Sequence, residues 1–100
     1  MIEDTLYLSK LYDCYGELLT DVQKEYFEDY YFQNFTCQEI ADNKAISRYA
    51  VNKQIKEAVV KLEFYEKILK ICDKKEKLEH VVDMLDNNEI KEEIKRIIWE

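Results

Sequence analysis

Apolar side chains recur three and four positions apart along almost the whole chain, which is the period of an amphipathic α-helix. This spacing predicts a first helix over residues 4–19. A second helix is expected over residues 21–32, because Thr20-Asp-Val-Gln23 is a capping box and Asn34-Phe35 forms a stop. The apolar positions of the two segments are Leu8, Leu11, Tyr12, Tyr15, Leu18, Leu19, Val22, Tyr26, Phe27, Tyr30 and Tyr31.

A second capping box, Thr36-Cys-Gln-Glu39, predicts a short third helix over residues 37–43. Ser47 is a good N-cap for a long fourth helix. That helix carries a heptad stripe of Val51, Ile55, Ala58, Leu62, Tyr65, Leu69 and Cys72, widened by Val59, Phe64, Ile68 and Ile71.

The apolar pattern fails over the charged residues 73–77 and resumes at Leu78. The long helix is therefore expected either to run unbroken to Leu85 or to kink within that charged stretch. Asp86-Asn-Asn88 is a turn signal. A last helix is expected over residues 89–99, with its apolar positions at Ile90, Ile94, Ile97, Ile98 and Trp99.

Composition narrows the fold class. The chain has 100 residues, enough for one domain, and it contains one glycine and no proline. A β-sandwich or barrel needs many turn residues, and glycine-rich nucleotide-binding loops need several glycines. We therefore expect an all-α domain over residues 1–100, with short helices that form a helix-turn-helix unit, one long helix and a short terminal helix.

The helix-turn-helix unit is expected at about residues 36–56. Two capped helices are joined there by a link of about four residues, and the apolar or small positions have the order that such a unit needs. These positions are Ile40, Ala41, Ile46, Val51 and Ile55. Ala41 lets the helices cross closely, and Ile46 is expected to fill the space under the turn. Ala45 stands where such turns usually have glycine.

If Val51 and Ile55 point inward, five residues must point outward: Arg48, Tyr49, Asn52, Lys53 and Lys56. Arginine pairs with guanine and asparagine with adenine, whereas lysines mostly contact phosphates. The sequence thus predicts a recognition helix for double-stranded DNA. Two capped helices with a short link also occur in many all-α domains that bind no DNA.

Charge is unevenly distributed in this acidic protein of net charge −7. Residues 1–46 carry a net −7, residues 47–77 carry +4 and residues 78–100 carry −4. A local basic segment is compatible with nucleic-acid binding through one element.

Several segments together resemble the YlxM family of small bacterial helix-turn-helix proteins. They are Leu18-Leu19-Thr20, Gln23-Lys24, Tyr26, Tyr30-Tyr31, Glu39-Ile40-Ala41, Ser47-Arg48-x-Ala50-Val51 and Ile55-Lys56. That family is itself similar to the promoter-reading fourth region of sigma factors. The resemblance covers the whole chain and implies a DNA-binding regulator. The genes of the YlxM family usually lie beside those of the signal recognition particle, and the resemblance therefore implies a role in protein targeting.

Neither catalysis nor metal binding is expected. Cys14, Cys37 and Cys72 are far apart and His80 is the one histidine, so no zinc site, catalytic set or cofactor is predicted. Three cysteines without a secretory signal indicate reduced thiols in a cytoplasm. No apolar run is long enough to span a membrane. Most of the eight tyrosines are expected to pack in the core, with Tyr49 as the exception.

The wide apolar face of the long helix leaves two alternatives. Either the terminal helix folds back over it, or a second copy of the chain covers it as a two-fold dimer. We favour the homodimer, with an interface that includes Ala58, Leu62, Tyr65 and Leu69. A DNA-binding regulator is the preferred function. A protein–protein adaptor of the targeting machinery is the alternative, and a working sigma factor is disfavoured because the chain has no room for polymerase binding.

Overall fold

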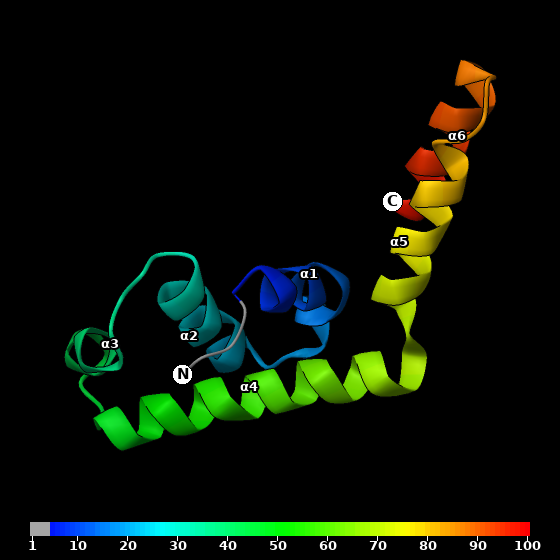
Figure 1. The fold of residues 1–100 in the computed structure, drawn as a ribbon. Helices are drawn as coiled ribbons and strands as arrows, with labels where there is room; N and C mark the ends of the chain where they lie inside the picture. Colours follow the sequence, from blue (N-terminus) through cyan, green and yellow to red (C-terminus); the bar gives the residue numbers. More distant parts are fainter. Residues whose placement is uncertain (1–4) are drawn as a thin grey trace.

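The computed structural model describes residues 5–100, and every regular element of that range is helical. The helices α1 to α4 form an N-terminal bundle in which α1, α2 and α3 lie along one side of the long α4 (Figure 1). The helices α5 and α6 form a C-terminal hairpin that projects from the end of α4 (Figure 1). The molecule is correspondingly elongated, with extents of 54 × 25 × 24 Å. The expected all-α class is confirmed.

Helix α1 spans Thr5–Tyr15 and is shorter than the sequence predicts. The chain then tightens into a 3₁₀ turn, η1, over Gly16–Leu18. A Cβ at Gly16 would lie 3.1 Å from the ring of Tyr12, so glycine fits this close approach. Leu18 lies in this turn and is exposed, so it does not continue the apolar side of α1. The predicted start at residue 4 lies outside the described residues.

Helices α2 (Asp21–Tyr31) and α3 (Cys37–Lys44) begin where their capping boxes predict. The Thr20 hydroxyl accepts the Gln23 N–H at 3.1 Å, and the Gln23 side chain accepts the Thr20 N–H at 3.2 Å. Thr36 forms the same reciprocal pair in front of α3. The apolar spacing of α2 places Val22 on or near its buried side, and this is wrong, because the residue sits in the first turn and is 45% exposed.

The core lies where α4 (Arg48–Leu69) crosses the first three helices. Most tyrosines of α1 and α2 pack there, as expected, with the Tyr12 and Phe27 rings stacked at 4.8 Å. Burial of this apolar surface supplies the main stabilisation, at roughly 25 cal/mol per Å². The buried apolar residues of the bundle are Leu8, Leu11, Tyr15, Leu19, Tyr26, Phe27, Tyr31, Ile40, Ala41, Val51, Ile55, Ala58, Val59 and Leu62.

The long helix neither runs to Leu85 nor kinks within residues 73–77; both expectations are wrong. Helix α4 ends at Leu69, and Lys70 adopts the left-handed conformation with φ 56°. The N–H of Lys70 donates to the carbonyl of Glu66 at 2.9 Å, which closes a left-handed cap. Helix α5 (Ile71–Val82) starts at the next residue. One residue therefore forms the corner between bundle and hairpin.

Helix α6 (Asn88–Ile98) runs back along α5 after a short turn capped by Asn87. Val82 and Ile98 are buried between the two helices. An ion pair of 2.8 Å joins Asp83 to Lys95. Because α6 packs on α5, it does not cover the exposed apolar residues Val60, Phe64 and Ile68 of α4, and the expectation that it folds back over the long helix is wrong.

Cys14 of α1 and Cys72 of α5 form a disulfide, with their Cα atoms 6.1 Å apart. The expectation of three reduced thiols is thus wrong for this pair. The two residues are 58 positions apart, and they meet because the start of α5 packs on the end of α1. Cys37 is free.

No helix of residues 5–100 has the length and hydrophobicity needed to cross a membrane.

Candidate nucleic-acid interface

The turn between α3 and α4 is held by a Schellman motif. Ala45 adopts the left-handed conformation, with φ 56° and ψ 43°, and its N–H donates to the carbonyls of Ala41 and Asp42. The N–H of Ile46 donates to the Ala41 carbonyl at 3.1 Å. Left-handed geometry costs a residue with a Cβ roughly 1–2 kcal/mol. Ala45 thus adopts the left-handed backbone conformation that glycine usually adopts in such a turn, and its Cβ makes this conformation strained.

The helix-turn-helix core is packed as the sequence predicts, with one exception. Ile40, Val51 and Ile55 are fully buried, and Ala41 lies at the crossing of α3 and α4 with 1% of its surface exposed. Ile46 was expected under the turn, but 39% of its surface is exposed. Its backbone closes the Schellman motif, which leaves the side chain at the surface. The short connection between the helices is therefore fixed mainly by hydrogen bonds.

Ser47 caps α4, and its hydroxyl accepts the Ala50 N–H at 3.0 Å. The burial of Val51 and Ile55 sets the rotation of the helix and so decides which side chains face solvent. The predicted outward residues do face solvent: Arg48, Tyr49, Lys53 and Lys56 are exposed, and Asn52 is half-buried. Tyr49, the aromatic residue of this set, has 76% of its surface exposed.

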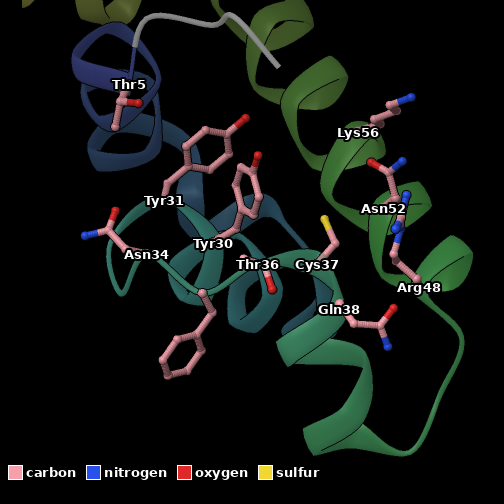
Figure 2. Close-up of a pocket in the computed structure, with 11 residues that line it drawn as sticks. Thr5, Tyr30, Tyr31, Asn34, Thr36, Cys37, Gln38, Arg48, Asn52 and Lys56 are labelled. Carbon is pink, nitrogen blue, oxygen red and sulfur yellow. The ribbon is translucent and has the colours of Figure 1, made fainter.

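A groove of about 730 Å³ runs beside this part of α4. Arg48, Asn52 and Lys56, spaced four residues apart, form one wall (Figure 2). The other wall comes from the end of α2, the loop after it and the first turn of α3, including Thr36 and Gln38 (Figure 2). None of the described residues that line the groove is acidic, although the chain has 22 acidic residues. The groove is thus suited to an anionic ligand.

The cations of the recognition helix are available for such a ligand. Within residues 5–100, no ion pair includes Arg48, Lys53 or Lys56. Lys44 at the end of α3 is different, because its ammonium group pairs with the Glu25 carboxylate of α2. That hydrogen bond raises the pKa of Lys44. Lys44 therefore joins two helices, whereas the other three cations remain free.

The arrangement matches the chemistry of a DNA groove. An α-helix fits the major groove, where a guanidinium can pair with guanine and a carboxamide with adenine. Arg48 and Asn52 lie in the first two turns, near the positive end of the helix dipole. Lysine ammonium groups supply contacts to phosphates.

The residues predicted to contact a second chain lie mostly inside the bundle. Ala58 and Leu62 are fully buried by helices of the same chain, so they are not available for an interface. Tyr65 is half-buried and packs on Tyr15, with ring centroids 5.9 Å apart. Leu69 is 43% exposed at the corner. The exposed apolar residues of the distal half of α4 are instead Val60, Phe64 and Ile68.

Sequence reasoning missed the second wall of the groove. Thr36 and Gln38 were predicted as parts of a helix start, and nothing assigned them to a site. A signal was present, because the capping box of α3 lies at the end that faces the recognition helix in a helix-turn-helix unit.

Among residues 5–100, no group of three or more His, Cys, Asp or Glu side chains could hold a metal ion.

Comparison with known proteins agrees with this architecture. Residues 2–99 match the model of the UPF0122 family, described as "Putative helix-turn-helix protein, YlxM / p13 like". A UPF0122 protein of Mycoplasma capricolum is 38% identical, covering 99% of this chain and 92% of the relative. One from Thermoanaerobacter sp. (strain X514) is 37% identical, covering 100% and 92%. One from Clostridium kluyveri is 35% identical, covering 97% and 96%. The chain therefore belongs to the UPF0122 family of YlxM/p13-like helix-turn-helix proteins.

Proposed function

We propose that this protein is a regulator that binds double-stranded DNA in a sequence-specific way, with α4 as its recognition helix. Arg48 and Asn52 contact base edges, Tyr49 contacts bases or sugars, and Lys53 and Lys56 contact phosphates. The groove beside α4 accommodates the DNA backbone. The protein has no catalytic role in this proposal and works in the cytoplasm.

The observation that carries the proposal is the set of three unpaired cations on the exposed side of a capped helix. In a chain of net charge −7, such cations would normally pair with the abundant carboxylates. Two of them, Arg48 and Lys56, border a groove without acidic lining residues, and Lys53 is exposed on the same helix. The acidic remainder repels DNA, so binding is expected to be weak at physiological salt and stronger at low salt.

The test is selection of bound fragments from random duplex DNA, followed by titration of an enriched sequence at several salt concentrations. Arg48→Ala should weaken binding by about tenfold or more and relax the base preference, since a bidentate arginine–guanine pair contributes about 1–3 kcal/mol. Lys53→Ala should weaken binding to all DNA sequences alike. It should also reduce the salt dependence of the affinity by about one released counterion.

Lys67→Ala is the matched control. Lys67 is an exposed lysine at the opposite end of the same helix, so its removal should leave DNA binding almost unchanged. If no DNA sequence binds saturably even at low salt, the proposal is wrong. Equal losses from the Lys67 and Lys53 variants would show that binding is nonspecific charge attraction.

The proposal includes a homodimer, since two recognition helices bind DNA more tightly than one. It also links the protein to the signal recognition particle pathway, following the family resemblance. The alternative function is a protein–protein adaptor of the targeting machinery. The net charge of −7 and the presence of only two arginines favour that alternative, and it becomes the preferred function if the DNA titration fails.

A further inference from the structure

The C-terminal hairpin exposes an unusual amount of apolar surface for two short helices. On α5, Leu78 and Val81 are 51% and 59% exposed; on α6, Ile90 and Ile97 are 51% and 63% exposed. Leu85 follows α5 and is 38% exposed. Contiguous exposed apolar patches of this kind usually mark a protein–protein contact.

These side chains lie along the same edge of the hairpin. Asp83 and Trp99 line a cavity together with residues of α1, so they mark the edge that faces the bundle. At 3.6 residues per turn, Leu78 and Val81 lie about 140° or more around α5 from Asp83, on the other side. Ile90 and Ile97 lie about 160° or more around α6 from Trp99. The outer edge of the hairpin is thus a two-helix apolar face.

Charge is polarised along the same hairpin. The last turn of α4, the corner and the base of the hairpin (residues 67–77) carry five lysines and two acids, whereas the tip of the hairpin (residues 83–93) carries five acids and one lysine. Lys74 lies one turn before Leu78 on the apolar face, with no ion pair in the described part of the chain. Glu93 lies between Ile90 and Ile97 on the same face, halfway along α6, and in residues 5–100 its one ion pair is with Arg96 of its own helix.

We propose that the outer edge of the hairpin binds the same edge of a second copy, with the two hairpins antiparallel. A two-fold axis then sets the basic base of each hairpin against the acidic tip of the other. Lys74 of one protomer faces Glu93 of its partner, and the two apolar faces cover each other. The hairpin is complementary to itself in this orientation, which favours a second copy over an unrelated protein.

The size of the face indicates how strong this association is. Helix α5 is about 18 Å long and two helices are about 20 Å wide, so the face measures about 360 Å². Standard interfaces bury about 800 Å² per partner. We therefore expect a reversible dimer that dissociates on dilution.

The first test is sedimentation equilibrium over a concentration series of the full chain. The protein should shift from its monomer mass of 12.2 kDa to twice that mass. Val81→Asp should hold the protein in the monomer state, because it puts a charge in the apolar face. His80→Asp, the adjacent exposed residue that lines the inner cavity, should leave the dimer intact.

A charge exchange tests the antiparallel orientation. Lys74→Glu and Glu93→Lys should each weaken the dimer about tenfold, because each sets like charges against each other. The double variant should recover most of the loss. Glu92→Lys is the matched control, since Glu92 makes the same charge change on the other side of α6.

This inference deepens the proposed homodimer and is independent of DNA binding. A wild-type chain that stays a monomer at all concentrations would overturn it, as would a Val81→Asp variant that still dimerises. Failure of the double variant to recover would overturn the antiparallel arrangement. Loss of DNA binding with an intact dimer would overturn only the proposed function, and the two failures are therefore distinguishable.

Discussion

The phenol of Tyr15 in α1 donates a hydrogen bond of 2.6 Å to the carboxylate of Glu66 in α4. The same carboxylate accepts the N–H groups of Cys72 and Asp73, each at 3.1 Å, and the phenol oxygen accepts the Ile71 N–H at 3.0 Å. The free N–H groups of the first turn of α5 are thus satisfied by two side chains of the bundle, whereas the N-cap residue Lys70 makes no side-chain hydrogen bond to them. This network fixes the hairpin to the bundle.

Removal of the Glu66 carboxylate should therefore loosen the corner. Glu66→Ala leaves the N–H groups of Cys72 and Asp73 without their partner, and we expect the free energy of unfolding to fall by about 2 kcal/mol. Urea denaturation measures this loss. The control is Glu63→Ala, an exposed carboxylate on the same helix, which should change the stability by less than about 0.5 kcal/mol. Similar losses for both variants would show that the capping network contributes nothing.

Alkaline pH should destabilise the fold. Burial, followed by the hydrogen bond to Glu66, raises the pKa of Tyr15 above its usual value of 10.0, and burial and Glu28 likewise raise the pKa of Tyr12. The unfolded chain ionises these phenols near their ordinary pKa. The stabilisation is thus complete below about pH 10 and is lost as the pH rises through the folded-state pKa values. Thermal melts between pH 8 and 11 should show falling stability, with a weaker dependence in Tyr15→Phe.

Glycine at position 45 should stabilise the helix-turn-helix unit. Ala45→Gly removes the Cβ that disfavours the left-handed φ of 56°, and we expect a gain of about 1 kcal/mol. Ala50→Gly, in the first turns of α4, should have the opposite sign and cost up to about 1 kcal/mol. Calorimetry on the two variants compares these effects directly. A loss of stability in Ala45→Gly would contradict the Schellman geometry of the turn.

Loss of the disulfide should release a 58-residue loop. In the chain-entropy description, closing a loop of that size stabilises the fold by on the order of 4 kcal/mol. Cys14→Ser should therefore lower the melting temperature of the oxidised protein. Dithiothreitol should lower the melting temperature of the wild type to nearly that of the variant. Cys37→Ser, which removes the free thiol, should retain the response to reductant. A wild-type melt that ignores the reductant would contradict the pairing.

A charge introduced at Leu62 should show whether this residue stabilises the fold of one chain or the contact between two chains. Leu62 is fully buried within one chain, so Leu62→Asp should cost about 3 kcal/mol or more and unfold the bundle. Glu63→Ala beside it should be nearly silent. Far-ultraviolet circular dichroism reports the outcome. A Leu62→Asp chain that stays folded but becomes monomeric would place this residue in an interface instead.

Helix starts could be predicted because their chemistry is local. Thr20, Thr36 and Ser47 each cap the helix that their sequence context indicates. The outward direction of the recognition helix was also predictable, because the burial of Val51 and Ile55 fixes its rotation. These inferences need only residues within a few turns of one another.

Features made by distant residues could not be predicted in the same way. The corner at Lys70 depends on Tyr15 and Glu66, which meet only after the bundle has formed. A heptad stripe shows that Ala58 and Leu62 are buried, but not whether the same chain or another one covers them. The second wall of the groove likewise arises from the fold, since the loop after α2 approaches α4 only in space.

The backbone of Lys70 sets the direction in which the hairpin leaves the end of α4. The side chains proposed to contact DNA lie at one end of α4, which is about 33 Å long, and the hairpin leaves from the other end. A rotation of about 10° at this single residue would move the far end of α5 by about 3 Å over its length of about 18 Å. In a pair of chains joined through their hairpins, the backbone of Lys70 would therefore govern the distance between the two DNA half-sites while leaving base preference untouched.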